Sequence, residues 1–89
     1  MRDLRIVLGL ALALACANAR SADVKVGKAI AEARCSQCHE ADDWDGEEAT
    51  SLESLMRDIA AGKVKHKTRL DLSPAEIANV AAYWAESSR

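Results

Sequence analysis

The sequence is poor in aromatic residues, in positive charge and in long apolar runs. It has no phenylalanine, one tyrosine and two tryptophans among 89 residues, so its own aromatic surface is small. Its formal net charge of −2 argues against general nucleic-acid binding. The longest apolar run covers residues 6–15, whereas a membrane-spanning helix needs about 20 residues. No internal repeat, low-complexity tract or second domain is visible in the sequence.

The N-terminal segment has the features of a secretory signal peptide. Basic residues precede the apolar run, and Ala17-Asn18-Ala19 matches an A-x-A cleavage site. We therefore expect residues 1–19 to be removed and residues 20–89 to form one exported, periplasmic domain; a retained membrane anchor is the alternative. Cys16 stands where lipoproteins carry a lipidated cysteine, but Ala13 replaces their usual leucine. We expect Cys16 to leave with the leader and no stable membrane insertion.

The most informative motif is Cys35-Ser36-Gln37-Cys38-His39. C-x-x-C-H is the attachment signature of a c-type haem. Thiols at positions i and i+3 lie on one side of a helical turn, so Cys35 and Cys38 can bond both vinyl groups of one porphyrin. His39 would then bind the iron through its imidazole, as the proximal ligand. The motif predicts one covalently bound haem c, which would also enlarge the small core.

Three other uses of these cysteines are possible. A zinc site could combine Cys35, Cys38, His39 and His66, but adjacent cysteine and histidine ligands suit tetrahedral geometry poorly. A thioredoxin-like redox pair would be surrounded by a βαβ pattern, which the sequence lacks. The two cysteines could also form a disulfide in an exported domain. The histidine directly after them favours haem.

Three helices are expected after the leader, which makes the domain all-α. The first begins at a Ser21 or Asp23 cap and ends near Arg34. Gly27 lies inside it, where glycine costs about 1 kcal/mol relative to alanine. This glycine either lets another helix approach closely or is simply tolerated. The apolar stripe of the first helix consists of Val26, Ile30 and Ala33.

The second and third helices have clearer boundary signals. Thr50 and Glu53 form a T-x-x-E capping box, and Gly62 ends the second helix in a left-handed conformation. Ser73-Pro74-Ala75-Glu76 supplies the N-cap, N1 proline and capping-box glutamate of the third helix. The second helix has the apolar residues Leu52, Leu55, Met56 and Ile59 at helical spacing. The third has Ile77, Val80, Ala81 and Trp84.

The two connecting segments carry opposite charges. Residues 40–48 contain six acidic side chains and are expected to form a solvated loop, in which Trp44 packs either on the haem edge or on a small core. In residues 62–73, charged and other side chains alternate. A period of two places His66 on the side of Val64 and Leu70, away from its basic neighbours. Those neighbours are Lys63, Lys65, Lys67 and Arg69.

Taken in order, these elements resemble a small class I c-type cytochrome. The matching pieces are Gly27 eight residues before Cys35, the C-x-x-C-H motif, and the stretches 59–63 (IAAGK), 72–77 (LSPAEI) and 80–84 (VAAYW). The resemblance implies an all-α, cytochrome c-like fold with three main helices around one covalently bound haem. It also implies that the first and last helices cross where Gly27 meets the region of Tyr83.

The sequence departs from this family at two places. Family members usually carry Met-Pro shortly after the Gly-Lys element, but residues 63–67 read KVKHK. Members also often have a proline soon after the haem-binding histidine, whose carbonyl orients the imidazole. Residues 40–46 contain no proline. The usual methionine ligand is therefore missing from its place, and the sequence does not show what orients His39.

Three kinds of side chain compete for the second axial position of the iron. His66 is the only other imidazole and stands where the family offers methionine, so it is the favoured ligand and would give bis-histidine coordination. Met56 is the only methionine after the leader, but it belongs to a helical apolar stripe, where core packing is its expected role. A neutral lysine from the basic segment, or an open position, completes the alternatives.

A small domain with both axial positions filled leaves little room for a substrate. We therefore expect an electron carrier with no catalytic residues, exchanging single electrons with redox protein partners as a monomer or as a subunit of a complex. The basic segment could dock an acidic partner or form a solvated loop. A small-gas sensor and a haem subunit of a larger oxidoreductase are the alternatives. Catalysis would need an open distal side, where only His66 with Arg69 could serve.

Overall fold

The computed structural model of the protein describes residues 22–89, and the expected leader with Cys16 lies outside them. The described residues form three α-helices and one short 3-10 helix, without any β-strand. In chain order these elements are α2 (Val24–Arg34), η1 (Ala41–Trp44), α3 (Ala49–Ala60) and α4 (Pro74–Ser87). An all-α domain with three main helices is thus confirmed. No helix within residues 22–89 has both the length and the apolar character that crossing a membrane requires.

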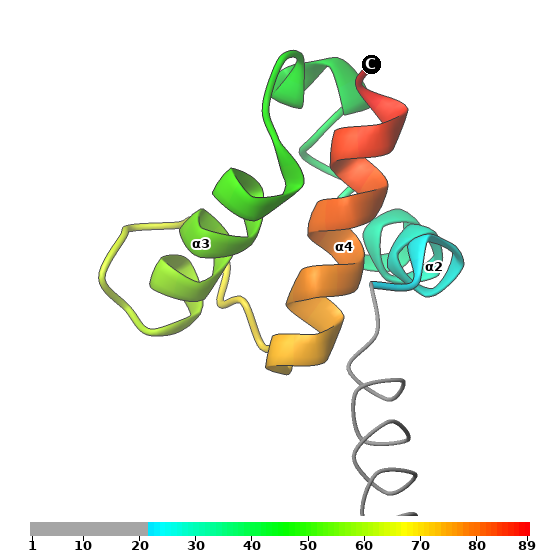
Figure 1. Ribbon diagram of the computed structural model, residues 1–89. Helices are drawn as coiled ribbons and strands as arrows, with labels where there is room; N and C mark the ends of the chain where they lie inside the picture. The colour runs from blue at the N-terminus through cyan, green and yellow to red at the C-terminus, as the bar shows by residue number, and fades with distance from the viewer. Residues whose placement is uncertain (1–21) are drawn as a thin grey trace, which may run out of the picture.

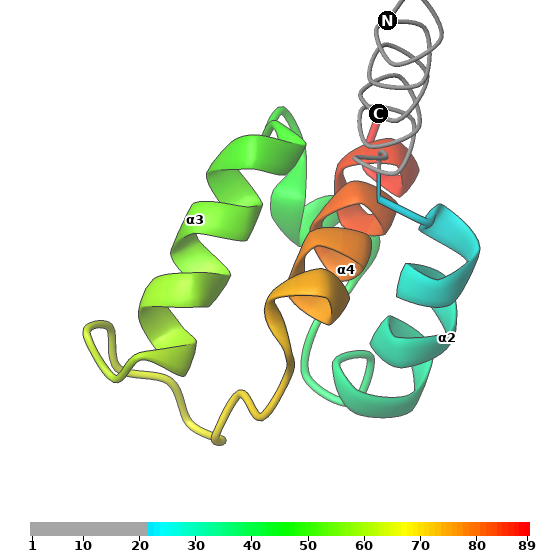
Figure 2. The ribbon, with the colours of Figure 1, turned by 60° about the horizontal axis from the view of Figure 1, so that its bottom comes forward.

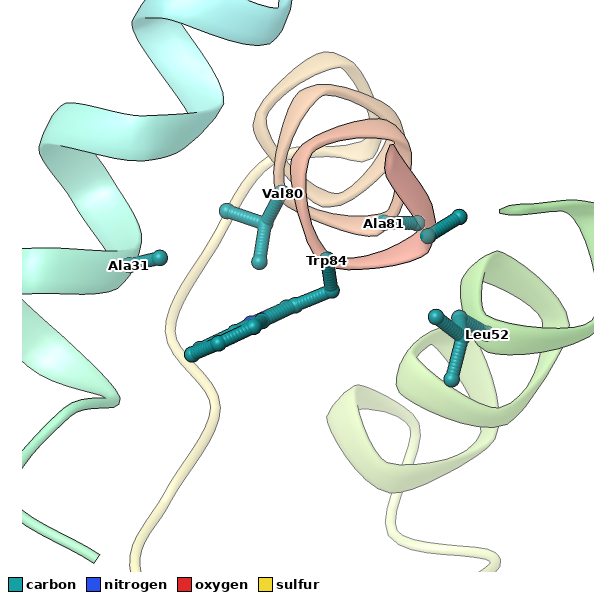
Figure 3. Packing of buried hydrophobic residues seen from close by; sticks show 6 residues of the cluster. Ala31, Leu52, Val80, Ala81 and Trp84 are labelled. Carbon is teal, nitrogen blue, oxygen red and sulfur yellow. The ribbon is translucent and has the colours of Figure 1, made fainter. Parts of the chain in front are cut away.

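Helix α4 is the central element of the domain. Helices α2 and α3 pack on opposite sides of it, and η1 lies near its C-terminal end (Figure 1, Figure 2). Within residues 22–89, α2 and α3 contact α4 but not each other. The buried core therefore follows α4, and in Figure 3 Trp84 extends into the space between α2 and α3. Its members are Ala31, Leu52, Val80, Ala81, Trp84 and Ala85.

The contact between α2 and α4 is close because of Gly27. A Cβ atom at this position would overlap the carbonyl group of Asn79 and lie 3.0 Å from Val80 N. The close-approach interpretation of Gly27 is confirmed, although the contact lies one helical turn before Tyr83. The side chain of Asp23 caps α2, and the backbone N–H of Asp23 donates to Asn79 Oδ1 at 2.8 Å. The close approach at Gly27 and the hydrogen bond from Asp23 thus both hold α2 against the first half of α4.

The buried face of α2 differs from the expected apolar stripe. Gly27 and Ala31 are buried, whereas Val26 is 44% exposed and Ala33 is also exposed. Ile30 is partly buried at the edge of the core. Helical spacing identifies apolar positions but not which of them meet a neighbour. Here Gly27 determines which face of α2 is buried, because two backbones approach most closely at the residue without a side chain.

Helix α3 begins before the predicted capping box. Its N-cap is Glu48, which makes no side-chain capping hydrogen bond. Thr50 therefore lies inside the first turn, and the T-x-x-E prediction is wrong. Ala49 packs against the core, so tertiary packing extends the helix beyond the local signal.

The other helix boundaries agree with the sequence. Gly62 has a φ of 79° just after α3, and Lys63 N–H donates to Asp58 O at 2.8 Å, as in a Schellman motif. At the start of α4, Glu76 N–H donates to Ser73 Oγ at 3.2 Å, and Ser73 N–H donates to the Glu76 carboxylate at 2.8 Å. The hydrogen bond from the Ser73 backbone is the main reason that the pKa of Glu76 is lowered. The stripe predicted for α4 is buried as expected: Ile77, Val80, Ala81 and Trp84.

Candidate functional site

A cavity of about 520 Å³ opens between the end of α2, the inner face of α3 and the segment that joins α3 to α4. Pockets that hold small molecules and cofactors typically have about 300–1,000 Å³. The α3 wall consists of Leu52, Leu55, Met56 and Ile59, so the stripe predicted for the second helix lines this cavity. The rest of the lining comprises Ala33, Arg34, Cys35, Gln37, Cys38, His39, Trp44, His66, Lys67, Thr68, Arg69, Leu70, Leu72 and Trp84.

The α3 wall is only partly covered by protein atoms. Leu52 reaches the core and is 5% exposed, but Leu55 is 41% exposed and Met56 and Ile59 are half-buried. Apolar surface that faces water in this way is typical of ligand-binding grooves. The wall therefore suits a flat, largely apolar occupant.

Cys35 and Cys38 lie in the turn that follows α2, and this turn forms part of the cavity wall. The N–H groups of Cys38 and His39 both donate to Cys35 O, at 3.1 and 3.0 Å. Both thiols are free and, together with His39, line the cavity. Burial raises the pKa of the Cys35 thiol, against the smaller opposing effects of a Trp84 hydrogen bond and the Arg34 charge. The C-x-x-C-H motif thus has both thiols and its imidazole at one wall.

The His39 ring is held by Asp43. Its Nδ1 lies 3.3 Å from Asp43 Oδ2, and Glu40 N–H donates to the same oxygen at 3.0 Å. These contacts lower the pKa of Asp43, with the Glu40 hydrogen bond as the largest cause. An ionised carboxylate only accepts hydrogen bonds. In the neutral imidazole, this contact places the proton on Nδ1 and leaves the lone pair of Nε2 for a metal ion.

The sequence prediction missed Asp43, because residues 40–48 were expected to form a solvated loop. They contain η1, which places the carboxylate four residues after His39 on the same side of the chain. The spacing of four residues between His39 and Asp43 was the sequence feature that could have predicted this contact. Trp44 ends η1, packs against the core as one of its two expected roles requires, and also lines the cavity. Its ring centroid lies 4.9 Å from that of His39, and its Nε1 is buried without a hydrogen-bond partner among residues 22–89.

His66 reaches the same cavity from the segment between α3 and α4. Its Nδ1 lies 2.7 Å from Thr68 O. A carbonyl oxygen only accepts, so Nδ1 is the donor and Nε2 is again free. The ring centroids of His66 and His39 are 6.1 Å apart, and the two planes differ by 19°. Imidazole nitrogens bind metal ions such as zinc at about 2.0–2.1 Å, so two imidazoles that share one ion have centroids on the order of 6 Å apart.

The strict alternation predicted for residues 62–73 is wrong. Consecutive residues 66–70 line the cavity, whereas Val64 is 38% exposed and lies outside the lining. A period of two requires an extended strand, and this segment is irregular, with turns and bends. Lys67 and Arg69 consequently stand at the cavity rather than opposite to it.

The structure bears on Met56 as an alternative axial ligand and on zinc as an alternative to haem. Met56 also lines the cavity, but it comes from α3 and packs against the core cluster. For zinc, residues 22–89 contain no group of three or more His, Cys, Asp or Glu side chains arranged to hold a metal ion. The four side chains proposed for a zinc site are therefore not assembled as one.

Comparison of the chain with protein-family models, with curated proteins and with solved structures gives no match. The chemistry of the site has to be inferred from the cavity and from the side chains around it.

Proposed function

We propose that this chain is a small class I c-type cytochrome that carries single electrons between redox proteins in the periplasm. One haem c is bound covalently through Cys35 and Cys38, with His39 and His66 as the axial iron ligands. The strongest support is that the C-x-x-C-H motif and His66, more than 25 residues apart in sequence, line one apolar cavity.

The residues around the cavity fit this group in volume, polarity and chemistry. The apolar α3 wall suits a porphyrin face, and two free thiols are available for thioether bonds. A haem in this cavity would cover the exposed part of Leu55. It would also complete a core that has few aromatic side chains of its own.

His66 is a better second ligand than Met56 for two reasons. Its ring centroid lies 6.1 Å from that of His39, a separation that suits one shared ion. Its hydrogen bond to Thr68 O uses Nδ1, so the neutral ring has its lone pair on Nε2. Met56, by contrast, contributes to the packing of α3, and a lysine could bind the iron only as a neutral amine.

When bound, the haem iron supplies reversible one-electron oxidation and reduction. Asp43 and Thr68 O would accept hydrogen bonds from the two Nδ1 atoms, so His39 and His66 would each present Nε2 to the iron. With haem bound, the apolar wall would cover one face of the porphyrin and keep water from it. Because histidine replaces methionine as the second ligand, the reduction potential should lie below that of a His/Met cytochrome c. This arrangement supports electron transfer rather than catalysis.

The basic segment beside the cavity suggests the kind of partner. Its four cations are exposed and form no ion pair with an acidic side chain of residues 22–89. Two of them, Lys67 and Arg69, line the cavity, so a partner bound here would stand close to the haem. An acidic redox protein is complementary to this surface, which consists of Lys63, Lys65, Lys67 and Arg69.

A small-gas binding protein is the second candidate. His66 belongs to an exposed, irregular segment and is held by a hydrogen bond to Thr68, only two residues away. Such a ligand can leave the iron without disturbing a helix. Exchange of His66 for carbon monoxide or nitric oxide in the wild-type protein would favour this function.

Mass spectrometry tests the covalent haem directly. The full chain is produced in a bacterium that exports and matures c-type cytochromes, and the purified protein is extracted with acid–acetone. We expect one haem to remain attached in the wild type and none in Cys35→Ala, Cys38→Ala. A haem that extracts freely from the wild type, or a bound zinc ion, would refute the proposal.

A further inference from the structure

Asp43 makes two hydrogen bonds with one carboxylate oxygen. Oδ2 accepts from Glu40 N–H at 3.0 Å and from His39 Nδ1–H at 3.3 Å. The backbone bond fixes the carboxylate within η1. This helix is itself anchored, because Ser88 Oγ donates to Trp44 O at 3.2 Å and Trp44 packs against the core. The oxygen beside His39 is thus held by the fold and not only by the histidine.

The two histidines of the site differ in the charge of their acceptors. His66 Nδ1 faces a neutral carbonyl oxygen of Thr68 at 2.7 Å, whereas His39 Nδ1 faces a carboxylate. A carboxylate partner fixes the tautomer of a ligating histidine and makes its free nitrogen more basic. A more basic ligand, with a negative charge behind it, stabilises the more positive oxidation state of the metal.

We propose that Asp43 is a positioning residue for the proximal histidine, which orients His39 and lowers the reduction potential of the iron. This inference rests on the proposed function, because it assumes that His39 binds haem iron. It assigns to Asp43 the orienting task for which no proline is present, and it adds a charge that a backbone carbonyl would not supply. The carboxylate is 43% exposed, so water and salt reduce the effect without removing it.

A simpler role is also conceivable, in which Asp43 only stabilises the start of η1. Asp43→Asn separates the two roles, because the amide oxygen can still accept from Glu40 N–H and from His39 Nδ1–H while the charge is lost. Asp42→Asn is the matched control. Asp42 is the adjacent residue of the same helix, is also an exposed aspartate, and makes no side-chain hydrogen bond within residues 22–89.

The test compares reduction potentials and oxidised-state electron paramagnetic resonance spectra of the haem-loaded wild type, Asp43→Asn, Asp43→Ala and Asp42→Asn. We expect the potential to rise in Asp43→Asn clearly more than in Asp42→Asn. Asp43→Ala should also broaden or shift the low-spin signal, because the His39 ring loses its orientation, whereas Asp42→Asn should keep it.

The outcomes separate this inference from the proposed function. Equal shifts of the potential in Asp43→Asn and Asp42→Asn, with an unchanged signal in Asp43→Ala, would overturn the role of Asp43 and leave the cytochrome intact. A wild type without covalent haem would instead overturn the proposed function, and this inference with it.

Discussion

The two sides of α4 are completed in different ways. On the α2 side, Gly27 brings two backbones together and Ala31 and Val80 are fully buried. On the α3 side, Leu52 reaches the core, but its apolar neighbours face a cavity of about 520 Å³ and residues 61–69 are exposed throughout. The α2 side is finished by protein atoms alone. If the proposed haem fills this cavity, folding and haem binding should be coupled mainly on the α3 side.

The largest effect should come from removing the attachment points of the occupant. In Cys35→Ala, Cys38→Ala the α3 wall stays exposed, and a single core in a domain of this size rarely supplies more than about 3–5 kcal/mol of net stability. We expect the doubly substituted protein to lose stable helix packing. Circular dichroism during heating measures this. A cooperative melt of the haem-free chain near the wild-type temperature would mean that the α3 side, too, is complete by itself.

A moderate effect is expected from Gly27→Ala on the α2 side. The new methyl group meets the Asn79 backbone, which cannot move like a flexible side chain. Overpacking of this kind costs about 1–3 kcal/mol, and the better helix propensity of alanine returns about 1 kcal/mol at most. The melting temperature of the haem-loaded protein should fall, while its absorption spectrum should not change.

Lys28→Ala is the control for this substitution, because Lys28 is the next residue and is exposed. It should change the free energy of unfolding by about 0.5 kcal/mol or less. If Gly27→Ala is as stable as this control, the close contact between α2 and α4 does not limit stability.

The smallest effect should be kinetic and confined to the cavity side. The chain has a formal net charge of −2, so its overall field should repel the anion ferricyanide, and added salt should speed oxidation of the reduced protein. If the basic segment controls approach to the haem, salt should slow the reaction instead. Lys63→Glu, Lys65→Glu should lower the rate several-fold at low salt.

The matched charge reversal lies on the other side of α4. Lys25 and Lys28 are exposed on α2, and Lys25→Glu, Lys28→Glu changes the total charge equally. Stopped-flow oxidation of both variants compares the two surfaces. Equal rates would show that only the total charge matters and would reject the basic segment as the entry surface.

Sequence patterns predicted the features that depend on neighbouring residues. The Ser73 cap, the left-handed Gly62 and the buried stripe of α4 follow from local hydrogen bonding and helical spacing, and all three are confirmed. The Thr50 capping box and the stripe on α2 failed because contacts with α4 decide where α3 begins and which face of α2 is buried. Packing against α4 thus outweighs the capping and spacing patterns of the local sequence.

In the candidate site, too, some residues were predicted from the sequence and others were missed. The C-x-x-C-H motif and His66 were identified from residue type and spacing, and they do share a cavity. The alternation argument that led to His66 was nevertheless incorrect, because the segment is not extended. Asp43 was missed because its contact with His39 depends on η1, a short 3-10 helix in a stretch whose acidic composition predicted only a solvated loop.

The absorption spectrum of the purified protein, reduced with and without carbon monoxide, tests the central claim most directly. A haem held by His39 and His66 should give a six-coordinate, low-spin spectrum that carbon monoxide leaves unchanged. His66→Ala should bind carbon monoxide, while Met56→Leu should keep the wild-type spectrum. The opposite pattern, with a methionine–iron charge-transfer band in the oxidised wild type that disappears in Met56→Leu and persists in His66→Ala, would contradict the bis-histidine assignment.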